Sequence, residues 1–172
     1  MIKSMAWLFA SIFGLLFITN FAQADSRQLL SSFRDWEAFV LQTDDGEKIC
    51  YMISVPKTKT PSDLRHGNPF VTITHKPARK ISNEVNFIVG YTFQNASLVQ
   101  ISIDNTKLPD LFTEGDGAWG YDSKQDNAMV TSMKRGTNLV LKGKSGRGND
   151  TSYRFSLSGF TAAHNAITKA CR

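Results

Sequence analysis

The chain has 172 residues, 41% of them hydrophobic, and its 20 basic and 15 acidic residues give a net charge of +5. The basic residues are scattered and form no dense run with interleaved aromatic residues. This distribution argues against a nucleic-acid-binding protein and allows at most a weak attraction to anionic surfaces.

The first 24 residues have the features of a secretory signal peptide. Lys3 is the only charge before Asp25, the segment 5–21 is almost wholly apolar, and Ala22-Gln23-Ala24 provides the small residues that signal peptidase accepts. A membrane anchor is the alternative, but the apolar run is shorter than the roughly 20 residues of a spanning helix, and a cleavage site follows it at once. We therefore predict a signal peptide with cleavage between Ala24 and Asp25.

The remaining chain, residues 25–172, has the size of one domain, and no later stretch is apolar enough to span a bilayer. It contains two cysteines, Cys50 and Cys171. Export places them in an oxidising compartment, where paired thiols usually become disulfides, so we predict a Cys50–Cys171 bond. Closing a loop of about 120 residues would contribute about 4–5 kcal/mol in the chain-entropy model. The alternative is two free, buried thiols.

In the N-terminal half of this domain, strands alternate with turns. Residues 25–35 are interpreted as a lead-in, and 56–69, with three prolines, as a long exposed loop. Asp44-Asp45-Gly46 between two apolar runs predicts a hairpin, and its second strand, apolar on both faces, is expected inside a sheet. The predicted strands are 36–42, 49–54, 70–75, 85–93, 99–103 and an interrupted edge piece at 107–112.

In the C-terminal half, two helices join the strands. The first is expected to be capped by Ser123 and to end at Gly136. Its buried face is predicted to consist of Ala128, Met129, Ser132 and Met133. Strands follow at 137–142 and 151–158, joined by a Gly-rich turn, and then a helix at 161–170. An apolar stripe on this helix consists of Phe160, Ala163, His164, Ile167 and Cys171. The pattern favours an all-β antiparallel sandwich, with an α+β roll as the alternative.

Possible catalytic and phosphate-binding motifs are incomplete. Gly143-Lys144-Ser145 matches only the end of a phosphate-binding loop, because Asn138 stands where the motif needs glycine and strands are predicted on both sides. The acidic residues of the first hairpin turn are interpreted as solvated charges. They are Asp44, Asp45 and Glu47.

The three histidines form none of the local pairs typical of metal sites. His66 lies on the proline-rich loop and is expected to be solvated. His75 ends a strand, and His164 lies on the apolar stripe, where a backbone partner is expected. We therefore predict no catalytic, cofactor-binding or metal-binding residues.

Several segments together resemble the invasion-associated locus B family of alphaproteobacterial envelope proteins. The segments are Phe33-Arg34-Asp35-Trp36, Lys48 to Pro56, Ala118-Trp119, Met133 to Gly136, Ser145 to Gly148, and Tyr153 to Ala163 with the final Cys171. The resemblance implies a periplasmic or surface protein with an immunoglobulin-like β-sandwich, linked in host-associated bacteria to host-cell colonisation or invasion. It brings no catalytic residues. Many members carry another cysteine soon after the Asp-Trp pair, but residues 38–42 contain none here, so Cys50–Cys171 is the only possible intrachain pair.

Three hypotheses for function follow. The first is a non-enzymatic envelope protein that binds an unknown partner and contributes to envelope integrity or host-cell interaction. The second is a periplasmic enzyme whose site is assembled from distant residues, such as His75 or His164 with an acid. The third is a folding helper that donates or accepts strands at an exposed sheet edge.

Overall fold

The computed structural model describes residues 26–172, which form an antiparallel β-fold with two α-helices. The strands are β1 (Ser26–Phe33), β2 (Trp36–Gln42), β3 (Lys48–Ser54), β4 (Thr58–Thr60), β5 (Phe70–Lys76), β6 (Ile81–Ile88), β7 (Leu98–Ile103), β8 (Thr106–Lys107), β9 (Leu111–Glu114), β10 (Gly117–Trp119), β11 (Asn138–Lys144) and β12 (Asp150–Ser156). The helices are α1 (Ser123–Met133), α2 (Phe160–Ala170) and a short 3-10 helix, η1 (Pro77–Arg79). The predicted signal peptide and the Ala24–Asp25 cleavage site lie outside the described residues.

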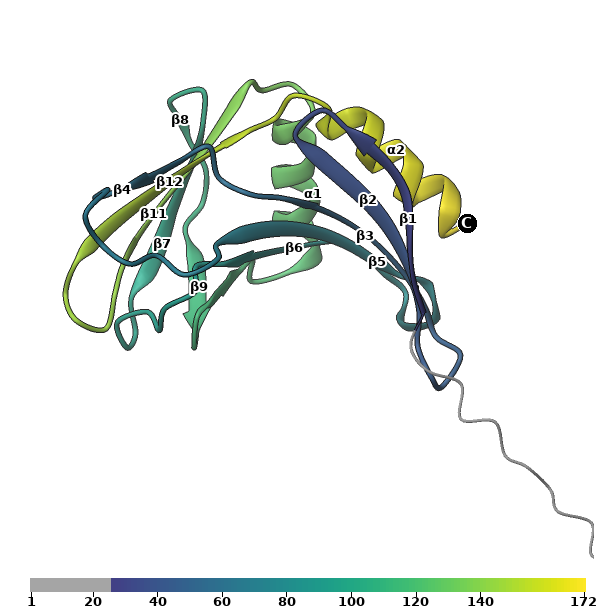
Figure 1. Cartoon of the computed structure of the whole chain (residues 1–172), viewed down its shortest axis with the longest axis horizontal. Helices are drawn as coiled ribbons and strands as arrows, with labels where there is room; N and C mark the ends of the chain where they lie inside the picture. Colours follow the sequence, from purple (N-terminus) through teal and green to yellow (C-terminus); the bar gives the residue numbers. More distant parts are fainter. Residues whose placement is uncertain (1–25) are drawn as a thin grey trace, which may run out of the picture.

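The strands form one continuous sheet in the order β1-β2-β3-β5-β6-β10-β9-β7-β11-β12-β4, with β8 paired to β7. Strand β7 connects its two halves, because Val99 pairs with β9 while residues 100–103 pair with β11. The two halves then face one another, as the ribbon in Figure 1 shows. Between them, the rings of Phe87 on β6 and Phe155 on β12 lie 6.1 Å apart. The predicted antiparallel, all-β class with two short helices is confirmed. The immunoglobulin-like order is not established, because the strands follow a single hydrogen-bonded path.

The hairpin of β2 and β3 forms as predicted. Cys50 pairs with Val40 across the two strands, and Gly46 adopts the positive φ of +83° that the turn requires. Strand β3 also pairs with β5, so it lies inside the sheet, as its two apolar faces indicated. This position buries Cys50 and Met52 completely.

Helix α2 covers the inner side of β1–β3, as Figure 1 shows. The predicted stripe is confirmed: four of its members are buried, and Cys171 packs against the same core. The ring of Phe160 meets Trp36 edge-on at 4.9 Å between centroids, and the Trp36 indole donates to the carbonyl of Ser156 at 3.0 Å. These contacts anchor the end of the chain on its first hairpin.

Two predicted loops are wrong in part. Residues 26–33 are not a lead-in but the edge strand β1, paired with β2. Seven of these eight residues are exposed, so the segment lacks the buried alternation by which strands are recognised. Within the predicted loop 56–69, residues 58–60 form β4, which pairs with β12 at the other edge of the sheet.

The bounds of other elements also shift. The predicted strand 85–93 ends at Ile88, and Gly90 turns the backbone at a φ of +73°. Helix α1 is capped by Asp122, whose carboxylate accepts from the Gln125 amide at 2.7 Å, and Ser123 is its first residue. Of the predicted buried face, Met129 and Met133 are buried, Ser132 is partly buried and Ala128 is exposed. Val130 is buried as well.

Candidate functional site

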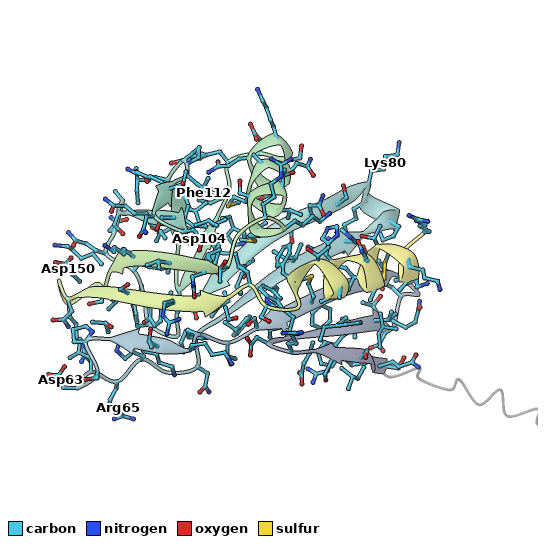
Figure 2. All side chains as sticks on the ribbon, turned by 90° about the horizontal axis from the view of Figure 1, so that it is seen from above. Asp63, Arg65, Lys80, Asp104, Phe112 and Asp150 are labelled. Carbon is cyan, nitrogen blue, oxygen red and sulfur yellow. A yellow bond between two sulfur atoms is a disulfide. The ribbon has the colours of Figure 1, made fainter. Side chains whose placement is uncertain are left out.

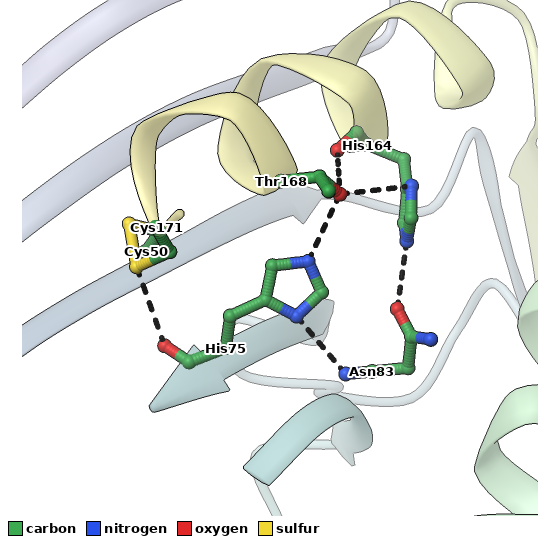
Figure 3. The surroundings of a disulfide bond; sticks show 6 residues. All are labelled: Cys50, His75, Asn83, His164, Thr168 and Cys171. Carbon is green, nitrogen blue, oxygen red and sulfur yellow. Dashed lines mark hydrogen bonds between the residues drawn. A yellow bond between two sulfur atoms is a disulfide. The ribbon is translucent and has the colours of Figure 1, made fainter. Parts of the chain in front are cut away.

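A disulfide joins the first hairpin to the end of the chain. Cys50 on β3 and Cys171 after α2 have an S–S distance of 2.01 Å and a Cα–Cα distance of 5.9 Å. The Cys171 sulfur lies 3.9 Å from the carbonyl oxygen of His75 (Figure 3). The bond therefore fixes α2, which carries His164, beside His75 on β5. These are the two histidines that the sequence offered as candidates for a catalytic site.

His75 and His164 form a buried pair below α2, with their rings 5.5 Å apart (Figure 3). The Asn83 amide donates to Nδ1 of His75 at 3.0 Å, so Nε2 of that ring carries the proton and faces the Thr168 hydroxyl at 3.2 Å. The Asn83 side-chain oxygen lies 2.7 Å from Nε2 of His164. Asn83 thus connects both rings. The sequence predicted a backbone partner for His164, but its partner is the side chain of Asn83.

Both imidazoles are held neutral. Burial is the main cause that lowers the pKa of His164 to about 4, with smaller contributions from Lys134 and His75. Burial likewise lowers the pKa of His75. Among the residues described, the contacts and charges acting on either ring include no carboxylate. Neither ring lines any of three pockets that residues 26–172 contain, with volumes of about 660, 460 and 530 Å³. The structure therefore brings the two histidines together without the acid that the enzyme hypothesis needs.

His66 is not solvated, contrary to the prediction. Its side chain is 7% exposed, with Nδ1 2.8 Å from the Tyr153 hydroxyl and Nε2 2.5 Å from the Pro61 carbonyl oxygen. The proline-rich loop folds back on β12, and close backbone contact between Gly67 and Gly90 secures it there. Sequence reading missed this contact because Tyr153 lies 87 residues away.

A polar pocket of about 660 Å³ lies next to this loop. Its walls come from the loop around His66, from Tyr91 and from the β11–β12 turn with Ser145 and Arg147. Figure 2 shows Asp63 and Arg65 of the loop at the same end of the molecule as Asp150, away from α2. The pocket is thus remote from the disulfide and the histidine pair.

The Gly143-Lys144-Ser145 segment ends a strand and enters a hairpin turn. The Ser145 hydroxyl accepts from the Asn149 amide at 3.1 Å, and β11 pairs with β12 along its whole length. A phosphate-binding loop would open a helix at this point, so the structure agrees with the hairpin interpretation.

The acidic residues of the first hairpin turn serve local structure. Glu47 forms an ion pair with Arg79 at 2.7 Å, although its partner is largely exposed. The Thr43 hydroxyl donates to Asp45, and this hydrogen bond lowers the pKa of that carboxyl. No group of three or more His, Cys, Asp or Glu side chains within residues 26–172 is arranged to hold a metal ion.

The outer face of the sheet carries partly exposed apolar side chains where a solvent-facing sheet normally carries polar ones. Residues alternate along each strand, so those next to the buried Ala38, Cys50 and Met52 point away from α2. We define the outer face by its apolar members Phe39, Leu41, Ile49, Tyr51, Ile53, Phe70, Ile88, Phe112 and Trp119. Phe39 is buried and the others are partly exposed. Polar side chains of β5 and β6 share this face, namely Thr72, Thr74, Glu84 and Asn86.

Aromatic contacts lie at both ends of the outer face. On β2 and β3, Phe39 and Tyr51 stack with centroids 5.2 Å apart, and the Arg27 guanidinium lies 4.7 Å from the Phe39 ring. On β9 and β10, Phe112 and Trp119 stack at 5.8 Å. Sequence reading missed the second pair because these strands are only four and three residues long and adjoin glycines that indicate turns.

The comparisons place the chain in a family. The model of the Invasion associated locus B (IalB) protein family matches residues 36–168, which is most of the chain. The chain belongs to the IalB family. The matched range includes the outer face, both histidines of the pair and Cys50, whereas Cys171 follows its end. A search of curated proteins finds no match. Neither α-helix of residues 26–172 has the length and hydropathy needed to cross a bilayer.

Proposed function

We propose that this IalB-family chain is an exported, non-enzymatic protein that binds a partner through its outer face and contributes to envelope integrity or host-cell interaction. Residues 1–24 serve as its signal peptide, cleavage occurs between Ala24 and Asp25, and residues 25–172 act as one domain of immunoglobulin-like sandwich type. The protein works in the periplasm, at the cell surface or after secretion.

The outer face is the observation that supports this proposal. Its apolar side chains lie on the opposite side of the sheet from α2 and the buried core. Thr72, Thr74, Glu84 and Asn86 on β5 and β6 separate the apolar side chains at its two ends. Apolar surface that a domain leaves partly uncovered is typical of interaction sites. Aromatic rings supply large, rigid contact area at such sites, and Tyr51 and Trp119 provide it at the two ends of this face.

The disulfide is consistent with an oxidising compartment, because such bonds rarely persist in a reducing cytosol. Two measurements test export. The amino terminus of the purified protein is expected to read Asp25-Ser26-Arg27, and cell fractionation is expected to recover the protein outside the cytoplasm. An intact Met1 on the protein recovered from cells would refute the cleavage.

Function is tested by deleting the gene and restoring it. The proposal expects the deletion to raise sensitivity to detergent or to reduce host-cell association, and expects the wild-type gene to restore both properties. Unchanged values of both in the deletion strain would overturn it.

A second candidate function rests on β1. This strand is an open edge of the sheet, and its exposed Leu29 and Leu30 leave it available for pairing with an extended segment of another protein. A folding helper would bind unfolded periplasmic proteins along this edge. Gln28→Pro removes one backbone N–H from β1 and should abolish the capture of an unfolded client by a folding helper. Capture at the wild-type level would exclude this second function.

A further inference from the structure

The end of the outer face at β9 and β10 contains a flat aromatic surface. Trp119 and Phe112 are cross-strand partners, and their ring planes differ by only 27°. The Tyr121 ring lies 5.3 Å from Phe112 and is 63% exposed. We call Phe112, Trp119 and Tyr121 the aromatic platform.

Gly117 explains why the indole lies flat. A Cβ at this position would lie 2.1 Å from Cη2 of Trp119 and 2.6 Å from Cζ2, far inside van der Waals contact. The φ of Gly117 is not among the positive values, so glycine serves here to admit the ring rather than to form a turn. The indole therefore rests against the backbone of β10 and remains partly exposed.

A pocket of about 530 Å³ adjoins the platform, between β6 and the start of α1. Two of its acidic groups already have partners: Glu84 pairs with Lys76 at 2.7 Å, and Asp122 caps α1. Glu114, by contrast, forms no ion pair or side-chain hydrogen bond with the residues described. Asn127 accepts from Asn83 at 2.6 Å through its oxygen, which leaves its NH₂ group to donate.

We propose that the platform and this pocket bind a neutral saccharide. This inference rests on the function proposed above. A pyranose ring has a flat face of C–H groups and a rim of hydroxyl groups. Its apolar face would stack on Trp119 and Phe112, while Glu114 accepts and Asn127 donates hydrogen bonds to the hydroxyls. The class of partner at this end of the outer face is therefore a glycan.

Charge and shape select this ligand over others. The pocket is lined by four carboxylates, from Glu84, Glu114, Asp122 and Asp126, and by one cation, Lys80. The excess of negative charge repels phosphate-bearing ligands such as nucleic acids. A cationic peptide would suit the charge. The two stacked rings, whose planes differ by only 27°, nevertheless offer an extended apolar contact, which a sugar ring matches better than a compact side chain does.

The test uses the intrinsic fluorescence of residues 25–172, which contain two tryptophans, Trp36 and Trp119. Trp36 is 1% exposed, so a ligand-dependent change reports on Trp119. Triacetylchitotriose, cellotriose and maltotriose are titrated separately, with trilysine as the cationic probe. A saturable change with at least one sugar, with a Kd on the order of 1 mM or lower, is expected. No saturable change with any sugar, or saturation by trilysine alone, would overturn the inference.

Calorimetry with the binding sugar compares variants that retain their thermal unfolding temperature. Trp119→Ala is expected to weaken binding at least tenfold, and Glu114→Gln to weaken it less. Val55→Ala, which truncates an apolar side chain that is 61% exposed and lies outside the defined outer face, is the matched control and should bind as the wild type does. Equal affinity of Trp119→Ala and wild type would place the sugar elsewhere and refute the site. The deletion strain could still show raised detergent sensitivity or reduced host-cell association while the protein binds no sugar. That result would refute the saccharide as the ligand and leave the proposed function standing.

Discussion

The two sides of the β2–β3–β5–β6 sheet differ in what their apolar residues do. On the inner side, Cys50 and Met52 are fully buried under α2, which the disulfide and the histidine pair hold in place. On the outer side, Tyr51 and Ile53 of the same strand remain partly exposed. Apolar composition alone therefore does not identify a core, because one strand supplies both the interior and a surface for a partner. The predictions below test this division between stability and binding.

Loss of the disulfide should have the largest effect on stability. Cys50→Ser with Cys171→Ser opens a loop whose ends are 121 residues apart in sequence. The free energy of unfolding should fall by about 4–5 kcal/mol, as the chain-entropy model gives for such a loop. Denaturant titration of the wild type and the double variant measures this difference. Reductant should destabilise the wild type and leave the variant unchanged, and a loss below 1 kcal/mol would show that α2 is held by packing alone.

Neighbouring residues on β3 provide a matched comparison of the two sides. Met52→Ala removes a side chain that is 0% exposed and leaves a cavity, so it should cost about 3 kcal/mol. Ile53→Ala changes the partly exposed side and should cost about 1 kcal/mol. Chemical denaturation compares the two variants. Equal costs would mean that the outer face is as tightly packed as the core.

The histidine pair should make stability depend on pH. The folded-state pKa of His164 is lowered to about 4 from an unfolded value of 6.5, so its contribution is present above pH 6.5 and is lost as pH falls toward 4. Between pH 7 and pH 5, protonation linked to this histidine should lower the free energy of unfolding by about 2 kcal/mol. Asp126 opposes the trend, because burial raises its pKa to about 6 and favours the protonated carboxyl of the folded state.

Comparing the pH profiles of the wild type and His164→Gln isolates the histidine, since Asp126 titrates in both. The variant should lose stability less steeply between pH 7 and pH 5. Parallel profiles would indicate that His164 is not held neutral by its burial.

The smallest effect on stability should come from the outer face. Trp119→Ala removes a ring that is partly exposed, so the free energy of unfolding should change by about 1 kcal/mol or less. Thermal unfolding measures it, with Met129→Ala in the buried face of α1 as the contrast. A loss for Trp119→Ala as large as that for Met129→Ala would assign the ring to the core.

Local patterns predicted those parts of the fold that depend on neighbours in sequence. The Asp-Gly turn identified the β2–β3 hairpin, and the spacing of Phe160, Ala163 and Ile167 identified the buried side of α2. The exposed strand β1 was missed because neither of its faces carries a buried alternation. Sequence reading finds a strand by the face that it buries, so an edge strand without one resembles a loop.

Contacts between distant segments could not be predicted in the same way. The burial of His66 depends on Tyr153, and the meeting of His75 with His164 depends on how α2 lies over β5. The two apolar faces of β3 were recognised, but their pattern does not indicate which one is covered. Only the arrangement of α2 assigns Met52 to the core and Tyr51 to the outer face.

The central claim, that the outer face is the binding surface, is tested most directly by complementation. Cells lacking the gene receive the wild type, the double variant Tyr51→Ser with Trp119→Ser, or the control Thr131→Ala on the exposed side of α1, each checked for export and thermal stability. The control should restore detergent resistance and host-cell association as the wild type does, and the double variant should restore neither. Full restoration by a folded, exported double variant would contradict the account.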